Sequence, residues 1–132
     1  MKSVLVVDDE FLIRWALREG LKDRYRVTTA SSVDEALEFI GSGPVDAVIT
    51  DLRMPLRSGM DLVKFLRGER PEVKVFVISA VGSDDEFNRC YDLDVEAVIR
   101  KPLELPLIRR LMELHVEGAA HAMGQGQKGA AG

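Results

Sequence analysis

Short apolar runs alternate five times with amphipathic stretches along the 132 residues of the chain. Four of these runs are nearly continuous, without the alternation of apolar and polar residues seen in half-exposed strands: Val4 to Val7, Val45 to Thr50, Val73 to Ile78, and Ala97 to Ile99. Continuous apolar strands are typical of a parallel sheet that helices bury on both faces. We therefore predict one α/β domain of the (βα)5 type with a doubly wound parallel sheet.

The amphipathic stretches predict five helices: Phe11 to Lys22, Ser32 to Ile40, Met60 to Arg67, Asp84 to Asp92, and Glu104 to about Glu117. Local signals support several of their ends. Ser32 and Glu35 have the spacing of a capping box, and Gly41 with Gly43-Pro44 predicts the end of that helix. Pro106 fits the first turn of the last helix, where its missing N–H is not needed.

Composition limits the class of protein. The formal net charge is −4 and the basic residues are scattered, so direct nucleic-acid binding is not expected. A single cysteine, Cys90, cannot form an internal disulfide, and no apolar stretch is long enough for a membrane span. These features predict a cytoplasmic protein. Residues 118–132 are rich in Gly, Ala and Gln, and we expect them to form a disordered tail or a linker stub.

Polar side chains stand at the ends of four predicted strands. They are Asp8 and Asp9 after the first strand, Asp51 after the third, Ser79 after the fourth and Lys101 after the fifth. In an open parallel sheet, ligand sites collect outside the carboxyl ends of the strands. We therefore expect these five side chains to converge on one site.

Three neighbouring carboxylates repel one another by about 1 kcal/mol per pair at ~4 Å in water, and by more in a drier site. A divalent cation would relieve this repulsion, and an all-oxygen ligand set favours Mg²⁺ or Mn²⁺. A structural role is also open for Asp8 and Asp9, because either could cap the helix that begins at Phe11. The presence of Asp51 and Lys101 favours the metal site.

Lys101 and Ser79 each allow two roles. The ammonium of Lys101 can form a salt bridge with Asp51, and the same charge can pair with a phosphoryl oxygen. The hydroxyl of Ser79 can bond a neighbouring backbone group, as serines at strand ends often do. Because the small residue Ala80 follows it, we favour a hydroxyl that contacts an incoming phosphoryl group.

Four motifs in this order resemble the signature of bacterial response-regulator receiver domains: Val6-Val7-Asp8-Asp9-Glu10, Asp51-Leu52-Arg53-Met54-Pro55 with Gly59, Ser79-Ala80, and Lys101-Pro102. Each motif is weak alone, but the four together are specific. The resemblance covers residues 1–117. It implies a flavodoxin-like fold with strand order 2-1-3-4-5.

The resemblance also implies the roles of the site residues. Asp51 would accept a phosphoryl group from a sensor histidine kinase or phosphotransfer protein, and Ser79 and Lys101 would contact that group. Mg²⁺ would be held by Asp8, Asp9, Asp51 and the main-chain carbonyl of Arg53. The chain would catalyse only its own phosphorylation and dephosphorylation, and would signal to an unknown output protein or domain, with a phosphorylation-dependent dimer as one form of output.

A finer resemblance points to receivers of the nitrogen-regulator (NtrC-like) subfamily. It is carried by Ile13-Arg14-Trp15 on the first predicted helix and by Arg53-Met54-Pro55 after the acceptor. Trp15 has two possible roles, as a half-buried packing residue or as a surface aromatic. Its helical spacing favours packing.

The chain departs from the family at three positions. Val98, three residues before Lys101, replaces the Tyr or Phe whose ring moves inward on phosphorylation, so no ring movement is available there. Asp94 replaces a Gly at the end of the fourth helix, and Asp tolerates the left-handed backbone expected at that turn. Leu103 replaces a frequent Phe. These changes concern the output face and leave the phosphorylation site untouched.

Two other functions remain open. Aspartyl-nucleophile phosphatases also combine a strand-end Asp with Mg²⁺ and Lys, but they typically carry a second Asp two residues on, where this chain has Arg53. A phosphorylation-independent interaction module is the stronger rival, because Val98 and Asp94 both alter the switch. The complete set of acids with Lys101 favours the phosphorylated receiver.

Overall fold

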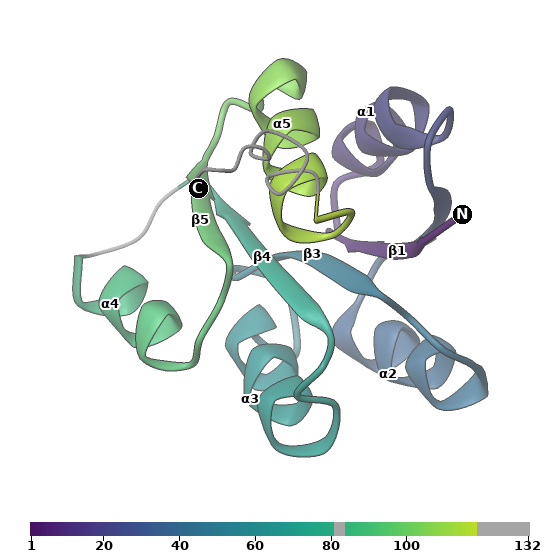
Figure 1. The fold of residues 1–132 in the computed structure, drawn as a ribbon. Coiled ribbons are helices and arrows are strands. Elements are labelled where there is room, and N and C mark those ends of the chain that lie inside the picture. Colours follow the sequence, from purple (N-terminus) through teal and green to yellow (C-terminus); the bar gives the residue numbers. More distant parts are fainter. Residues whose placement is uncertain (81–83, 119–132) are drawn as a thin grey trace, which may run out of the picture.

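The computed structural model describes residues 1–80 and 84–118. Its centre is a five-stranded parallel sheet in the order β2-β1-β3-β4-β5, with helices on both faces (Figure 1). The strands are β1 (Ser3–Val7), β2 (Arg26–Ala30), β3 (Ala47–Asp51), β4 (Lys74–Ser79) and β5 (Ala97–Arg100). The predicted doubly wound sheet and its strand order are confirmed.

Two layers of helices cover the sheet. The helices are α1 (Phe11–Leu21), α2 (Val33–Ser42), α3 (Gly59–Glu69), α4 (Asp84–Asp92) and α5 (Leu105–His115). α1 and α5 lie on one face, while α2, α3 and α4 lie on the other (Figure 1). The termini of the predicted helices differ from the observed ones by at most two residues. The predicted tail lies outside the described residues from 119 onward.

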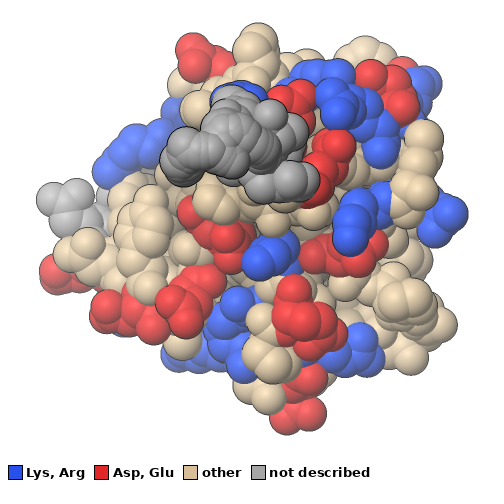
Figure 2. Space-filling view, viewed as in Figure 1, with Lys and Arg blue, Asp and Glu red and all other residues tan. Residues whose placement is uncertain are grey.

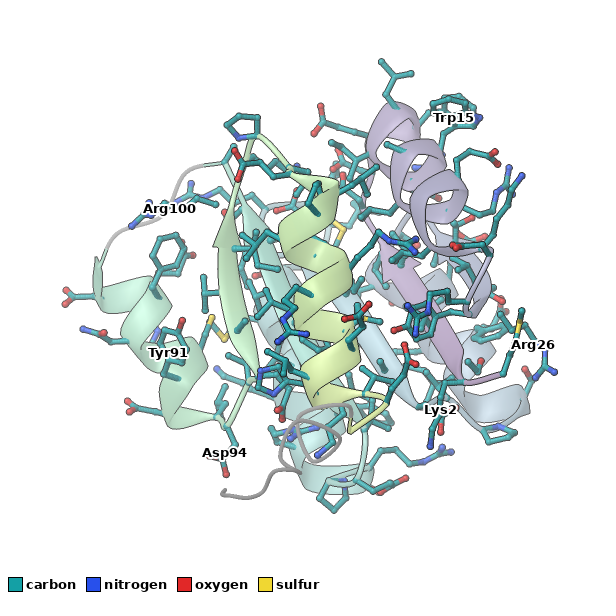
Figure 3. All side chains as sticks on the ribbon, turned by 45° about the horizontal axis from the view of Figure 1, so that its top comes forward. Lys2, Trp15, Arg26, Tyr91, Asp94 and Arg100 are labelled. Atoms are coloured by element: carbon teal, nitrogen blue, oxygen red, sulfur yellow. The ribbon has the colours of Figure 1, made fainter. Side chains whose placement is uncertain are left out.

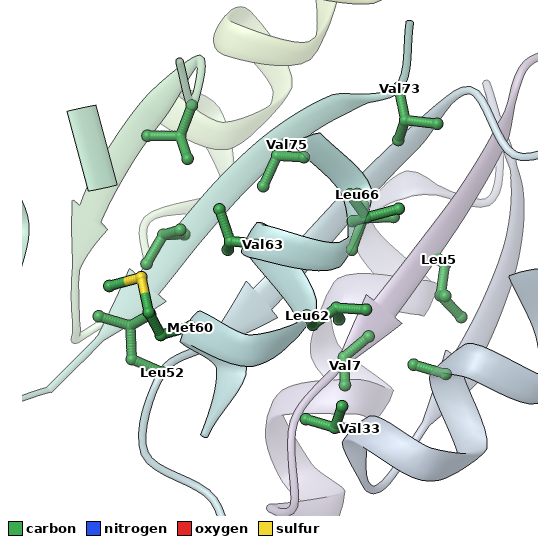
Figure 4. Close-up of a cluster of buried hydrophobic side chains, with 14 of the residues drawn as sticks. Leu5, Val7, Val33, Leu52, Met60, Leu62, Val63, Leu66, Val73 and Val75 are labelled. Atoms are coloured by element: carbon green, nitrogen blue, oxygen red, sulfur yellow. The ribbon is translucent and has the colours of Figure 1, made fainter. Parts of the chain in front are cut away.

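Alternate residues of each strand enter opposite layers, as the pleat requires. In β1, Leu5 and Val7 pack with α2 and α3, whereas Val4 and Val6 pack with α1 and α5. Figure 4 shows the first of these clusters, in which Leu62 and Leu66 of α3 cover the middle of the sheet. Because both faces of the central strands are buried, their apolar runs are continuous in the sequence.

The N-terminus of α2 confirms part of the predicted capping box. The Ser32 hydroxyl accepts the amide of Glu35 at 3.1 Å. The Glu35 carboxylate accepts the amide of Ser31 at 2.5 Å, one residue before the predicted partner. The helix continues through Gly41 to Ser42, so the predicted end at Ile40 was wrong. A glycine near a helix end is tolerated at a small cost.

Two residues other than glycine have a left-handed backbone among the described residues. Asp94, after α4, has φ 60°, as its side chain predicted, and its amide donates to the carbonyl of Tyr91. Leu56, in the loop after β3, has φ 72° and was not anticipated. The amide of Arg57 donates to the carbonyl of Pro55 at 2.8 Å, which closes a tight turn around Leu56.

Gly59 brings α3 against the end of β3. Its amide donates to the carbonyl of Leu52 at 2.8 Å. A Cβ atom at this position would lie 1.8 Å from the carbonyl oxygen of Asp51, far inside van der Waals contact. The glycine therefore permits the close backbone approach that fixes the loop directly after Asp51.

Gly59→Ala should destabilise the domain by roughly 1–3 kcal/mol, the usual range for overpacking, because the methyl group would push α3 away from β3. Gly68→Ala is the matched control, since nothing lies within 4 Å of a Cβ at that helical glycine. Better helix propensity should make this control more stable by up to about 1 kcal/mol. Urea denaturation of the two variants measures both changes. Equal stability of Gly59→Ala and wild type would refute the close approach.

Candidate functional site

The carboxyl ends of four strands surround a cleft of about 350 Å³. It is lined by Asp9, Glu10, Asp51, Arg53, Ser79, Ala80 and Lys101. Asp8 is fully buried beside this cleft, and its carboxylate lies within 4.8 Å of those of Asp9 and Asp51. The structure therefore brings together the five side chains that the sequence placed at strand ends.

Asp51 is the last residue of β3 and is only 5% exposed. One carboxylate oxygen, Oδ1, accepts the amide of Arg53 at 3.3 Å, and the other, Oδ2, accepts a hydrogen bond from Lys101 at 3.1 Å. The hydroxyl of Thr50 donates to the Asp51 carbonyl at 2.9 Å. The parallel sheet and these contacts hold the carboxylate at the base of the cleft.

Lys101 joins three acids through one ammonium group. Its Nζ lies 2.9 Å from Glu10, 3.1 Å from Asp51 and 3.2 Å from Asp8. Burial alone would lower the pKa of Lys101, but the hydrogen bonds that its ammonium donates to Glu10 and Asp51, together with the charge of Asp8, outweigh this effect. The pKa of Lys101 therefore lies above its ordinary value, and the side chain stays charged. The predicted salt bridge between Lys101 and Asp51 is confirmed.

Asp8 combines burial with an incomplete set of partners. Its Oδ1 accepts the amide of Glu10 at 2.9 Å, whereas Oδ2 is buried and has the ammonium of Lys101, 3.2 Å away, as an ion-pair partner that it shares with Glu10 and Asp51. Burial raises the pKa of Asp8, and the charge of Asp51 adds to this effect, while the Glu10 amide and Lys101 oppose it. The charged form of Asp8 is therefore costly without a further cation.

The alternative role of Asp8 or Asp9, as a cap of α1, is not what the structure shows. The N-cap residue is Glu10, and its side chain makes no capping hydrogen bond. Asp8 bonds the amide of Glu10, which precedes the helix, and Asp9 is exposed at the cleft. Glu10 itself was missed as a partner of Lys101. The run of three acids at residues 8–10 carried that signal, but the sequence did not show which of them face the lysine.

The donor set fits a hard divalent cation. Asp8, Asp9 and Asp51 each offer a carboxylate oxygen, and the buried Oδ2 of Asp8 is an acceptor without a hydrogen bond. Mg²⁺ prefers oxygen ligands and usually binds one or two carboxylates together with waters and phosphate oxygens. The residues present therefore match the predicted magnesium site, while the part played by the Arg53 carbonyl stays a prediction.

Ser79 ends β4 and is fully buried. Its carbonyl accepts the amide of Lys101 at 3.0 Å, which ties the ends of β4 and β5 together. Ala80, the next residue, is exposed and lines the cleft, so the small side chain leaves space beside the Ser79 hydroxyl. The role of that hydroxyl stays a prediction.

The edge of β5 is covered by aromatic side chains from α4. Val98 is half-buried, and its amide donates to the hydroxyl of Tyr91 at 3.3 Å. The guanidinium of Arg100 lies 4.3 Å from the centre of the Phe87 ring. Figure 3 shows Tyr91 and Arg100 at this edge. β5 has Val98 where the family has an aromatic ring. The rings at this edge belong to Phe87 and Tyr91 of α4, and the sequence did not predict their contacts with β5.

Trp15 belongs to the surface, so the favoured packing role was wrong. It is 49% exposed and projects from α1 (Figure 3). Phe11 and Leu12, at the start of the same helix, are 64% and 73% exposed. These three residues, the α1 patch, follow directly after the acids of the cleft.

Lys101→Met should lower the free energy of unfolding by roughly 1.5–3 kcal/mol at neutral pH without divalent ions, the scale of hydrogen bonds to charged groups. Without the ammonium, the pKa of Asp8, which burial already raises, should rise further in the folded state. An acid whose pKa is raised in the folded state makes the fold less stable as pH rises, because the unfolded chain gives up that proton more easily. The free energy of unfolding recovers as pH falls. The deficit relative to wild type should therefore shrink in acid.

Urea denaturation at neutral and acidic pH tests this expectation. Lys22→Met is the matched control, because Lys22 pairs with Glu19 at the exposed end of α1 and such pairs contribute little. A deficit that is the same at both pH values, or the same in both variants, would contradict a charge-balancing role for Lys101.

The profile of the family described as "Response regulator receiver domain" matches residues 4–113. The response regulator protein PilR of Pseudomonas aeruginosa is 33% identical over 112 residues, which are 84% of this chain and 25% of PilR. The hydrogenase transcriptional regulatory protein HoxA of Cupriavidus necator is 38% identical over 101 residues, which are 76% of this chain and 21% of HoxA. NtrC-like regulators are among the relatives.

Solved structures agree with these matches. A receiver domain from Clostridium thermocellum has a TM-score of 0.83 and 27% identity, and the match covers 93% of this chain and all of that one. TrrA from Thermotoga maritima, solved in complex with Mg²⁺-BeF, has a TM-score of 0.77 and 30% identity, over 86% of this chain and 98% of TrrA. In the described part of the chain, no helix has the length and apolar character that a bilayer span needs.

The chain spans only a quarter or less of PilR and HoxA, so the shared part is one domain of those longer regulators. The family profile, over residues 4–113, covers all but the first residue of the sheet and every residue that lines the cleft. The family match, the strand order and the cluster of three aspartates around Lys101 agree. We conclude that this chain belongs to the response regulator receiver domain family.

Proposed function

We propose that this chain is a phosphorylation switch in which Asp51 accepts a phosphoryl group from the phosphohistidine of a sensor kinase. One observation carries the proposal: the Asp51 carboxylate lies at the base of an open cleft with two further carboxylates and the ammonium of Lys101. A strand-end acid in this setting is a poor structural choice, because burial of clustered charge is costly. It is a good acceptor for a phosphoryl group.

In the proposed transfer, an Asp51 oxygen forms a bond to phosphorus as the bond from phosphorus to the histidine nitrogen breaks. Lys101 is already held at the acceptor by Glu10 and Asp51, so its charge can pair with a phosphoryl oxygen without a large movement. The Arg53 amide keeps the carboxylate oriented. We expect the Ser79 hydroxyl to contact the bound phosphoryl group from β4.

Asp8, Asp9 and Asp51, with the main-chain carbonyl of Arg53, would hold Mg²⁺. When bound, the ion neutralises charge that develops on the transferring phosphoryl group. The unsatisfied Oδ2 of Asp8 supports this assignment from the chain itself. The complex of TrrA with Mg²⁺-BeF supports it from a related receiver.

The proposed output is a changed protein-binding surface. We place the receiver unit at residues 1–117 and residues 118–132 outside it. The chain matches one part of longer regulators, so we propose an output domain or a separate output protein as its target, with dimer formation on phosphorylation as one possible readout. Such a chain acts as a switch and turns over no substrate beyond its own phosphoryl group.

Acetyl phosphate with Mg²⁺ should add one phosphoryl mass to the wild-type chain, and removal of Mg²⁺ with EDTA should abolish the addition. Asp51→Asn should prevent it, because an amide oxygen is a far weaker nucleophile than a carboxylate. Asp61→Asn, an exposed acid on α3, is the control and should react like wild type. Intact mass spectrometry measures all three. A full mass increment in Asp51→Asn would refute the acceptor, and no increment in wild type would favour the interaction module.

We further propose that the α1 patch is where the donor protein docks. Phe11, Leu12 and Trp15 are exposed next to the cleft, and large exposed apolar side chains in one patch mark interaction sites. Arg14 and Arg18 flank a hollow of about 120 Å³ that Phe11 and Trp15 also line. The patch therefore offers apolar anchors with a basic rim.

With a histidine kinase that phosphorylates the wild-type chain, Trp15→Ala and Leu12→Ser should slow transfer at least tenfold, the usual scale of an interface hot spot. The rate with acetyl phosphate should not change, because a small donor needs no docking surface. Phosphorylation followed over time with both donors checks the difference. If the rate of phosphorylation falls equally with both donors, the patch affects the reaction at Asp51 and not the docking of the kinase.

A further inference from the structure

The side chain of Arg53 connects the cleft to α4. Its amide donates to Asp51, and the residue lines the cleft. Its guanidinium nitrogen Nη2 lies 3.6 Å from Oε1 of Glu86, in the first turns of α4. A cationic side chain two residues after Asp51 therefore contacts α4.

The ion pair between Arg53 and Glu86 has the features of a contact in which Arg53 can change its partner. Its 3.6 Å separation exceeds the length of a hydrogen bond, so charge alone holds these two atoms. The Arg53 side chain is 60% exposed, whereas that of Glu86 is 19% exposed. Ion pairs with an exposed partner contribute little to stability. Oε1 of Glu86 is nevertheless buried and accepts no hydrogen bond, so the departure of Arg53 carries a desolvation cost that only a stronger partner for Arg53 can offset.

A phosphoryl group on Asp51 would offer Arg53 a stronger partner. At neutral pH such a group carries about −1.5 to −2 charges and three acceptor oxygens. Guanidinium binds phosphate through two parallel hydrogen bonds, whereas Nη2 of Arg53 lies 3.6 Å from Oε1 of Glu86, beyond hydrogen-bond length. The new acceptor would sit in the cleft that Arg53 already lines.

We propose that Arg53 exchanges Glu86 for the phosphoryl group on Asp51, and that this exchange releases the first turn of α4. The inference rests on the proposed function, because it requires a phosphoryl group at Asp51. It assigns Arg53 as a phosphoryl-binding residue and Glu86 as the group that competes with the phosphoryl group. It also supplies a route to α4 in a chain whose β5 has Val98 in place of a movable ring.

The release is confined to one end of α4. Farther along the helix, Phe87 stacks with Arg100 and Tyr91 bonds the amide of Val98, so the side of α4 against β5 stays attached. Acidic side chains gather over α4 (Figure 2). Loss of the Arg53 cation from Glu86 makes this surface more negative near the cleft. The phosphorylated chain would therefore differ from the unphosphorylated chain in the charge at the start of α4.

The test uses beryllofluoride with Mg²⁺ as the phosphoryl mimic on five full-length proteins. They are wild type, Arg53→Gln, Glu86→Gln, the double variant and Arg57→Gln. Arg57→Gln is the matched control, because Arg57 lies in the same loop and carries the same charge, but pairs with Asp34 and does not line the cleft. Arg53→Gln leaves the main-chain carbonyl in place. NMR titration gives the affinity and the shifts of α4 amides in one experiment.

Arg53→Gln should weaken binding of the mimic roughly tenfold or more, the scale of hydrogen bonds to a charged group. Glu86→Gln should tighten binding, because the competing anion is gone. The double variant should match Arg53→Gln, since Glu86 acts through Arg53. The amides near Glu86 should shift on binding in wild type and not in Arg53→Gln, and in free Glu86→Gln they should already resemble the bound wild type.

Three results would overturn the exchange. The first is Arg53→Gln with the affinity of Arg57→Gln. The second is Glu86→Gln tightening binding equally in the Arg53→Gln background, which would mean that Glu86 acts by a through-space field. The third is an unchanged α4 response in Arg53→Gln. A wild-type chain that binds no beryllofluoride and gains no phosphoryl mass would overturn the proposed function together with the exchange, so the two failures are distinguishable.

Discussion

The ammonium of Lys101 holds the functional end of this domain together. It lies among Asp8, Glu10 and Asp51, which come from the ends of β1 and β3 and the start of α1. Without a cation there, three carboxylates would face one another in a cleft of low dielectric, where their repulsion is several times that in water. The packing of the sheet brings the acids together, and Lys101 makes that convergence tolerable.

The balance that Lys101 provides is incomplete, and this is what makes the site reactive. One ammonium cannot neutralise three acids, and Oδ2 of the buried Asp8 has an ion pair with Lys101, which two other acids share. A buried carboxylate that is only partly neutralised costs free energy, which a further cation would reduce. The fold tolerates the cost because two apolar layers and the close contact at Gly59 hold the strand ends in place. The site is therefore organised before any ligand binds.

α4 meets the sheet edge through polar as well as apolar contacts. Besides Phe87 and Cys90 in the core, it is held by a cation over a ring, a tyrosine hydroxyl at a strand amide and an ion pair from the loop after Asp51. Polar contacts of this kind respond to a change of charge, whereas buried apolar packing does not. A charge placed on Asp51 would therefore act on α4 through Arg53, which lines the cleft and contacts Glu86.

The sequence by itself determined the parallel sheet and the set of residues at its carboxyl edge, and its resemblance to receiver domains implied the strand order. Apolar runs mark buried strands locally, and the rule that parallel strands end at one edge turns their last residues into a site. Only the tertiary structure decided that Asp8 is buried while Asp9 is exposed, that Glu10 shares Lys101, and that Arg53 reaches Glu86. These contacts join side chains whose elements are far apart in the chain. Their directions depend on how α1, α4 and the loops pack, and no local pattern of residues encodes that packing.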